Sequence, residues 1–159
     1  MGAPLQVWQM SLSPHTTMFP ARLARIRALQ QFLERFCAAA GVDGDACLRM
    51  NLVLEELFTN TVRHGYGGDC DAPVWIRIAR EGELVSIVYE DTAPPFNPYQ
   101  RLPAVSPDDT TVQMRKLGGL GVLLTKKLAA SRDYAYVFGR NRIRLTFRLS
   151  QDTRPSGAA

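Results

Sequence analysis

The chain of 159 residues is predicted to form an α+β fold, a two-layer sandwich in which helices cover one face of a mixed, mostly antiparallel sheet. Three observations support this class. Strand-like segments follow one another directly in two places, and adjacent strands joined by short turns form antiparallel hairpins. Two helical patterns lie together before the first such pair. The regular alternation of single strands and helices that builds a parallel sheet does not occur in the sequence.

The chain is predicted to begin with a strand and a helix. Gln6 to Ser13 alternates loosely between apolar and polar residues, which suits a first strand. A helical pattern then opens at Phe19-Pro20 and ends by Gly41. Its apolar residues recur at spacings of three and four, at Leu23, Ile26, Leu29, Phe32, Leu33 and Phe36.

A second helix is predicted to follow at once. Asp43 or Asp45 suits its N-terminal cap, and the helix stops at the glycine-rich stretch that begins at Gly65. This helix carries four spaced apolar residues, Leu48, Leu52, Leu57 and Val62.

The second half is predicted to hold two hairpins separated by a long loop and a third helix. Residues 73–80 and 83–91 alternate as strands across a turn at Glu81-Gly82. Residues 93–116 lose periodicity and contain five of the ten prolines, and so long a connection is usually functional. A helix follows Gly121, and strands are predicted at 134–138 and 142–149, joined at 139–141. In the last strand the odd-numbered residues from Ile143 onward are apolar and face one way.

Composition favours one domain over residues 1–150 with a flexible tail at 151–159. No apolar run reaches the length of a bilayer, and the three cysteines form no close pair, so we expect a cytoplasmic protein with free thiols and no membrane partner. The net charge of +4 is carried mostly by arginine, without the dense basic stripe typical of nucleic-acid binding. The charge therefore predicts no direct nucleic-acid partner and a solvated surface, with an acidic protein or a phosphate-bearing ligand as the alternative.

Three polar residues four positions apart stand out in the second predicted helix. Glu56, Asn60 and His64 recur at i, i+4 and i+8, which places them on nearly the same helix face in an otherwise apolar segment. A carboxylate can accept a proton, an amide oxygen can bind a hard cation, and an imidazole can bind an anion. A solvated helix face would account for the same residues equally well, so the row alone does not define a site.

Two further motifs follow downstream. Asp91 lies where a predicted buried strand runs into the segment Thr92-Ala93-Pro94-Pro95, and a carboxylate there can accept a hydrogen bond from an exocyclic amine, although Asp is also an ordinary turn residue. Gly118-Gly119-Leu120-Gly121 precedes a helix, where glycines let the backbone approach phosphates and free amides favour anions. The glycine motif is neither a P-loop nor a Rossmann fingerprint, and its place after the long segment suggests a lid.

In this order and on these elements, the three motifs resemble those of the GHKL ATPases, the superfamily of gyrase, histidine kinases and MutL. More narrowly, the chain is similar to the bacterial anti-sigma factor serine/threonine-protein kinases of the RsbW type, over about Leu5 to Leu149. The resemblance implies a single histidine-kinase-like ATP-binding domain of the Bergerat type. It also implies ATP and Mg²⁺ as cofactors.

The resemblance gives a role to each matching position. Glu56 matches the catalytic general base, Asn60 the magnesium ligand, and Asp91 the residue that recognises adenine. The implied nucleotide-binding residues are Asn60, His64, Asp91, Ala93, Lys116, Gly118, Gly119, Leu120 and Gly121. Leu117 stands where some related kinases carry an arginine, and Arg115 or Lys116 would then reach the γ-phosphate instead. Thr146 alternates with the arginines of the last strand and is therefore a poor match for an adenine-binding threonine.

The function that the resemblance implies is that of an anti-sigma factor and Mg-ATP-dependent serine/threonine kinase. Its substrate would be a STAS-domain antagonist in a partner-switching system, and its sequestered partner a sigma factor or other regulator. Homodimerisation is a further expectation. The alternative is an ATP-binding regulatory module that sequesters a protein partner with little or no kinase activity, and Leu117 motivates it.

Overall fold

The structure is a computed structural model that describes residues 14–99 and 119–149, and its elements follow the predicted order. A 3₁₀ turn at Leu23–Arg25 precedes α1, and a π-helical turn at Thr61–Gly65 continues α2. The helices and strands are β1 (His15–Pro20), α1 (Ile26–Ala40), α2 (Gly44–Asn60), β2 (Pro73–Glu81), β3 (Leu84–Asp91), α4 (Gly119–Leu128), β4 (Ser131–Val137) and β5 (Arg140–Arg148).

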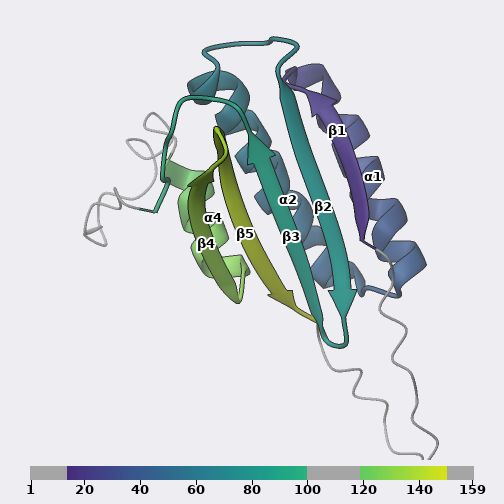
Figure 1. The fold of residues 1–159 in the computed structure, drawn as a ribbon. Coiled ribbons are helices and arrows are strands. Elements are labelled where there is room, and N and C mark those ends of the chain that lie inside the picture. The colour runs from purple at the N-terminus through teal and green to yellow at the C-terminus, as the bar shows by residue number, and fades with distance from the viewer. Residues whose placement is uncertain (1–13, 100–118, 150–159) are drawn as a thin grey trace, which may run out of the picture.

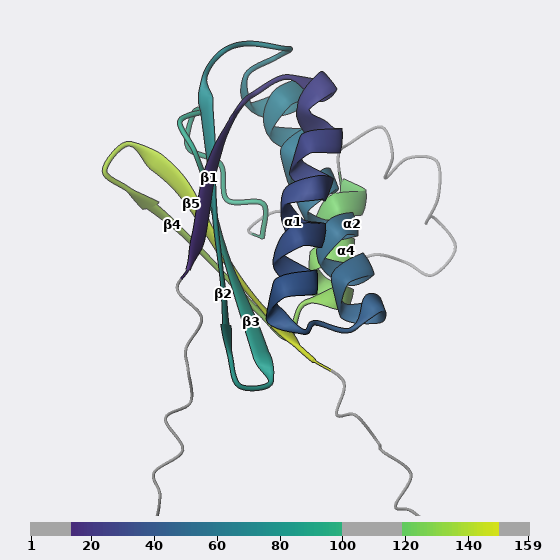
Figure 2. The same ribbon diagram turned by 90° about the vertical axis from the view of Figure 1, so that its right-hand side faces the viewer.

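The five described strands form one sheet in the order β1-β2-β3-β5-β4 (Figure 1). Each neighbouring pair is antiparallel, so the sheet contains no parallel pairing among these strands. Helices α1, α2 and α4 all lie against one face of the sheet, and the opposite face carries no described helix (Figure 2). The predicted α+β class, with two layers and helices on one face, is confirmed.

The core lies between the sheet and the helices because each element buries one face. The alternating residues Ile76 and Ile78 of β2, Ile87 of β3, and Leu145 and Phe147 of β5 are fully buried. They meet the buried stripes of α1 and α2, which include Leu29, Leu33, Phe36, Met50, Leu54 and Phe58. Burial of each such side chain stabilises the fold by about 1.5–3 kcal/mol.

The first described strand, β1, lies where the sequence pattern predicted the opening of a helix. The predicted strand at Gln6 to Ser13 lies outside the described residues, and β1 instead ends at Pro20, where the helix was predicted to open. Phe19 is buried and pairs with Val74 of β2, so it belongs to the sheet's inner face. Proline lacks a backbone N–H and fixes φ, so Pro20 suits the end of an edge strand.

Of the four apolar residues that marked the second helix, Leu57 and Val62 are buried as predicted, and the other two are not. Leu48 and Leu52 are 58% and 42% exposed, whereas Val53, Leu54 and Phe58 are buried. Spacings of three and four from Met50 define the buried stripe, and the two leucines lie outside it. The cap is Asp43, whose side chain accepts a hydrogen bond from the backbone N–H of Ala46 at 2.8 Å.

The last hairpin turns earlier than predicted. Its turn residues are Phe138 and Gly139, with φ of 51° and 74°, and β5 begins at Arg140. A two-residue turn with positive φ at both positions matches the twist of an antiparallel pair. Asn141, expected in the turn, therefore lies in the sheet and pairs with Asp91 of β3.

Within the described ranges, no helix is long and apolar enough to cross a membrane. All three cysteines are free thiols, as predicted. Burial raises the pKa of the Cys37 thiol, which packs against Cys47.

Candidate nucleotide-binding site

The end of α2 and the end of β3 meet through buried hydroxyls. The π-helical turn begins with Thr61, which is buried and donates a hydrogen bond from Oγ1 to Asp91 Oδ2 at 3.0 Å. The Tyr89 hydroxyl donates to the same Thr61 oxygen at 2.9 Å, and burial raises the pKa of Tyr89 well above its ordinary value. Single π-helical turns are often found at functional sites. Thr61, the residue after Asn60, is therefore hydrogen-bonded to Asp91, the predicted adenine-binding residue.

Asp91 is held in one orientation by protein donors. Asp91 is only 5% exposed. Its Oδ1 accepts hydrogen bonds from Ala93 N at 3.0 Å and from Asn141 Nδ2 at 2.8 Å. Each carboxylate oxygen offers about two acceptor positions. Oδ1 is therefore saturated, while Oδ2 accepts only from Thr61 among the described residues. Oδ2 keeps an acceptor position for one more donor.

Asn141 organises the loop after β3, and the sequence reasoning missed it. Its Nδ2 also donates to the carbonyl oxygens of Ala93 and Pro94, at 3.0 and 3.2 Å. Its Oδ1 accepts from Phe96 N at 3.0 Å and from the Tyr134 hydroxyl at 2.7 Å. One signal was available in the sequence, because Asn141 shares the odd-numbered, inward-facing positions of the last strand. A polar residue at an inward position requires partners, and these partners form the site.

Tyr66, in the glycine-rich stretch after α2, binds the start of the loop that follows β3. Its hydroxyl accepts a hydrogen bond from Thr92 N at 2.9 Å, lies 3.0 Å from Thr92 Oγ1 and donates to Pro73 O at 3.3 Å. Burial raises the pKa of this hydroxyl. Gly65 lies next to Ala93, and a Cβ added at Gly65 would stand 2.9 Å from the Ala93 Cβ. The segment from Asp91 to Ala93 is thus packed directly on the turn that ends α2.

Replacement of Gly65 by alanine is expected to push Ala93 away and to disturb its hydrogen bond to Asp91. Overpacking of this kind destabilises a fold by about 1–3 kcal/mol, because the Ala93 Cβ is fixed to the backbone and cannot rotate away. The midpoint of urea unfolding and the affinity for ATP should both fall. Gly44→Ala is the matched control, since no atom lies within 4 Å of its added Cβ. An unchanged midpoint and affinity for Gly65→Ala would contradict the close packing.

The three residues of the predicted polar row lie on α2 and on the π-helical turn that continues it. Glu56 and Asn60 are half-buried on α2, while His64 is exposed on the π-helical turn. None of the three side chains forms a hydrogen bond or ion pair with another described residue, so each can bind an added group. Glu55 differs from Glu56, because its Oε2 accepts a hydrogen bond from Gln30 Nε2 of α1 at 3.1 Å. This contact favours Glu56 over Glu55 as the available carboxylate.

The glycine motif is described only in part. Lys116, Leu117 and Gly118 lie outside the described residues. Gly119, Leu120 and Gly121 form the first residues of α4, which packs beside α2. Gly119 and Gly121 therefore lie within the first turn of α4, whereas the pattern predicted that the helix follows Gly121.

The donor set for a metal ion is small. Within residues 14–99 and 119–149, no three His, Cys, Asp or Glu side chains gather at one place. Mg²⁺ is often held by one or two protein ligands together with substrate phosphates, and it keeps several waters. The half-buried Asn60 amide, with no described partner, fits this mode of binding and would hold the ion jointly with a nucleotide.

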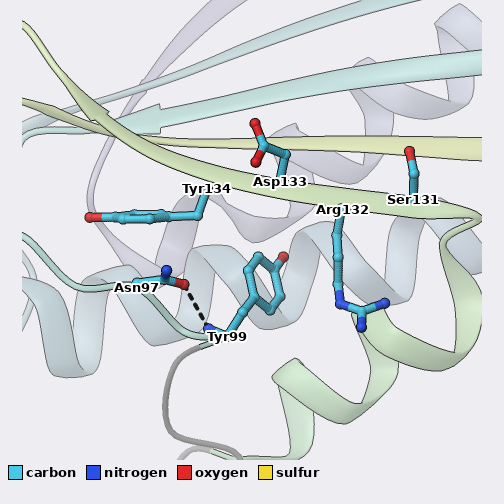
Figure 3. A pocket seen from close by; sticks show the side chains of 6 residues that line it. All are labelled: Asn97, Tyr99, Ser131, Arg132, Asp133 and Tyr134. Carbon is cyan, nitrogen blue, oxygen red and sulfur yellow. Dashed lines mark hydrogen bonds between the residues drawn. The ribbon is translucent and has the colours of Figure 1, made fainter.

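A separate pocket of ≈ 510 Å³ lies beyond the loop, between residues 97–99 and β4 (Figure 3). The lining residues are Asn97, Tyr99, Ser131, Arg132, Asp133 and Tyr134. The Arg132 guanidinium stands over the Tyr99 ring at 5.7 Å. None of the predicted site residues is among these six, and Tyr134 connects the pocket to the site through its hydrogen bond to Asn141.

A comparison with known protein families identifies the class of domain to which this fold belongs. Residues 19–147 match the family of histidine kinase-like ATPase domains, and the chain belongs to that family. ATP binding follows as the property that this family implies.

The chain is also similar to one characterised protein and to one solved structure. The chain is 23% identical over 115 residues to the serine-protein kinase RsbW of Listeria monocytogenes, a match that covers 71% of this chain and 73% of the relative. Among solved structures, it is similar to the RsbU and RsbW domains of Rv1364c from Mycobacterium tuberculosis, with a TM-score of 0.62 and 18% identity. That match covers 87% of this chain but only 33% of the solved chain, and it confirms the fold.

Proposed function

We propose that the chain is a Mg-ATP-dependent serine/threonine protein kinase that also acts as an anti-sigma factor. The observation that carries the proposal is the hydrogen bond from Thr61 to Asp91, which places the end of α2, where Asn60 precedes Thr61, against a fixed, buried carboxylate. The similarity to a serine-protein kinase of Listeria monocytogenes supports this choice of reaction.

The free acceptor position on Asp91 Oδ2 suits an exocyclic amine. Adenine carries such an amine at C6, and a carboxylate acceptor selects it over a base with a carbonyl oxygen there. The backbone amides at the start of α4 favour phosphates, because the first N–H groups of a helix have no partner within the helix. The nucleotide is thus expected to run from Asp91 towards α4.

Glu56 is the proposed general base. Its carboxylate would take the proton of a serine or threonine hydroxyl on the substrate protein as the hydroxyl oxygen attacks the γ-phosphorus. The new O–P bond forms as the bond to the β–γ bridging oxygen breaks, and ADP leaves with that electron pair. Mg²⁺ at Asn60 would neutralise charge on the phosphate oxygens. Half-burial and the lack of a described partner leave Glu56 available for this role.

The proposed substrate is a STAS-domain antagonist, and the proposed sequestered partner is a sigma factor or another regulator. A phosphoryl group adds a charge of about −1.5 to −2 at neutral pH and weakens an interface that cannot accommodate it. The phosphorylated antagonist would then release the kinase, which becomes free to bind its second partner. Exchange of this kind is competition between two partners for one protein.

The alternative is an ATP-binding module without phosphotransfer, motivated by Leu117 in the predicted lid. The deciding experiment incubates the purified chain with γ-labelled Mg-ATP and a native lysate of its source, beside an Asn60→Ala variant. We expect one small protein to be labelled on serine or threonine by the wild type alone. If the chain retains ATP but labels no protein in a way that depends on Asn60, the ATP-binding module without phosphotransfer is favoured. Absence of ATP retention would refute both functions.

A further inference from the structure

The sheet face opposite the helices carries a second set of ordered side chains, which we call the outer face. Directly paired residues of antiparallel strands point to the same side of a sheet. Since Ile76, Ile87 and Leu145 face the helices, their chain neighbours face outward. The outward residues in the middle of the sheet are Met18, Trp75, Arg77, Val88, Glu90, Arg142 and Arg144. No described helix covers them (Figure 2).

One row of the outer face is locked by mutual contacts. Glu90 accepts a hydrogen bond from Arg142 Nε at 2.7 Å, and Arg140 Nη1 lies 3.7 Å from the other carboxylate oxygen. The Arg140 guanidinium also stacks over the Trp75 ring at 3.8 Å. Met18, which pairs with Trp75 across the strands, is 54% exposed. This row combines tryptophan, arginine and methionine, residue types enriched in protein–protein interfaces, and its tryptophan, arginine and glutamate side chains hold one another in place.

The next row presents two cations without ion-pair partners in the described chain. Arg77 of β2 and Arg144 of β5 are both exposed, and each pairs with Val88 of the strand between them. Their Cα atoms are thus about 10 Å apart, two strand spacings. Asp133 pairs with Arg144 across β4 and β5, yet the two form no ion pair. The negative charge of Glu90 is already taken by Arg140 and Arg142.

We propose that the outer face is a docking surface for an acidic protein segment, with Arg77 and Arg144 binding its carboxylates beside the apolar Trp75–Met18 row. Guanidinium groups pair with carboxylates bidentately, and the locked row loses little conformational freedom on binding. Arg140 already stacks on one face of Trp75, which leaves less of that ring for stacking with nucleic-acid bases.

The test uses a fluorescein-labelled poly-glutamate peptide and the full chain, with binding followed by fluorescence anisotropy. We expect the double variant Arg77→Glu/Arg144→Glu to weaken binding at least tenfold. The matched control, Arg27→Glu/Arg35→Glu, makes the same change in net charge at two exposed positions of α1 and should weaken binding about twofold or less. Circular dichroism checks that both variants are folded.

Each other outcome overturns the proposal. If both double variants lose the same affinity for the peptide, the peptide is attracted by the net charge of the protein and not by the outer face. Tighter binding of oligo-dT than of the peptide, lost in the outer-face variant, would make the surface a nucleic-acid site. Concentration-dependent self-association that the outer-face variant abolishes would make it an interface between copies. Neither ATP binding nor kinase activity enters the readout, so failure of the proposed kinase function would leave this test unaffected.

Discussion

Asp91→Asn is expected to lower the affinity for ATP roughly 100-fold while leaving the chain folded, since a hydrogen bond to a charged group contributes about 1.5–3 kcal/mol. The substitution preserves the size of the side chain. Its remaining oxygen can still accept from Ala93 N and Asn141 Nδ2, the two donors that hold the loop. The new NH₂ group replaces Oδ2, however, and meets the adenine amine donor to donor. It also faces the Thr61 hydroxyl, which donated to Oδ2, so we expect an additional loss of stability of about 1–3 kcal/mol, measured by urea unfolding beside the affinity for ATP.

Isothermal titration with ATP and with inosine triphosphate measures the effect. Inosine has a carbonyl oxygen where adenine has its amine, so Asp91→Asn should reduce the preference for ATP over ITP. Asp133→Asn is the control, because this exposed aspartate lines the separate pocket beside β4. If Asp133→Asn weakened ATP binding and Asp91→Asn did not, the nucleotide site would lie in that pocket instead.

Glu56→Gln is expected to reduce phosphotransfer about 10²- to 10⁴-fold, the usual contribution of a general base. Glutamine keeps the shape of the side chain and cannot accept the proton of the attacking hydroxyl. The affinity for ATP should stay within about twofold of the wild type, because the proposed role begins only when the hydroxyl attacks. Glu56 forms no described contact whose loss would unfold the chain.

Two measurements separate catalysis from binding. One is phosphoryl transfer to the partner protein under single-turnover conditions, and the other is the affinity for ATP. Glu55→Gln is the matched control, since Glu55 is the adjacent carboxylate and accepts a hydrogen bond from Gln30. Glutamine can still accept that bond, so we expect near wild-type transfer. Equal transfer by Glu56→Gln and wild type would exclude Glu56 as the base, and loss confined to Glu55→Gln would move the role to Glu55.

Much of the fold was predictable because long periodic segments report burial directly. Alternation identified both hairpins, and spacings of three and four identified α1. The edge strand β1 was missed because it is short and ends in proline, a residue that suits the start of a helix as well as the end of a strand. Its pairing with β2 is a long-range contact that no local window contains.

Leu48 and Leu52 illustrate a second limit of sequence patterns. An amphipathic stripe predicts that a helix has a buried face, and the phase of that face depends on where the neighbouring elements pack. The stripe through Met50, Leu54 and Phe58 meets the sheet, so the two leucines point outward.

The candidate site, too, could be predicted from the sequence only in part. The spacing of Glu56 and Asn60 and the place of Asp91 at a strand end were readable, because they depend on helix and strand geometry within one segment. Asn141 was not recognised, because its role depends on the turn at Phe138-Gly139, which moves it from a predicted loop into the sheet. Tertiary structure alone joins it to Asp91, fifty positions earlier in the chain.

The sequence by itself determined the α+β class, the order of the elements and the motifs of a histidine kinase-like ATPase, because periodicity and spacing are local properties. The tertiary structure decided the edge strand, the buried stripe of α2, the hydrogen bonds that fix Asp91 and the arginine rows of the outer face. These features depend on strand register and on which face of each element meets another. A buried polar group must find its partners wherever the fold provides them, and those partners are distant in sequence.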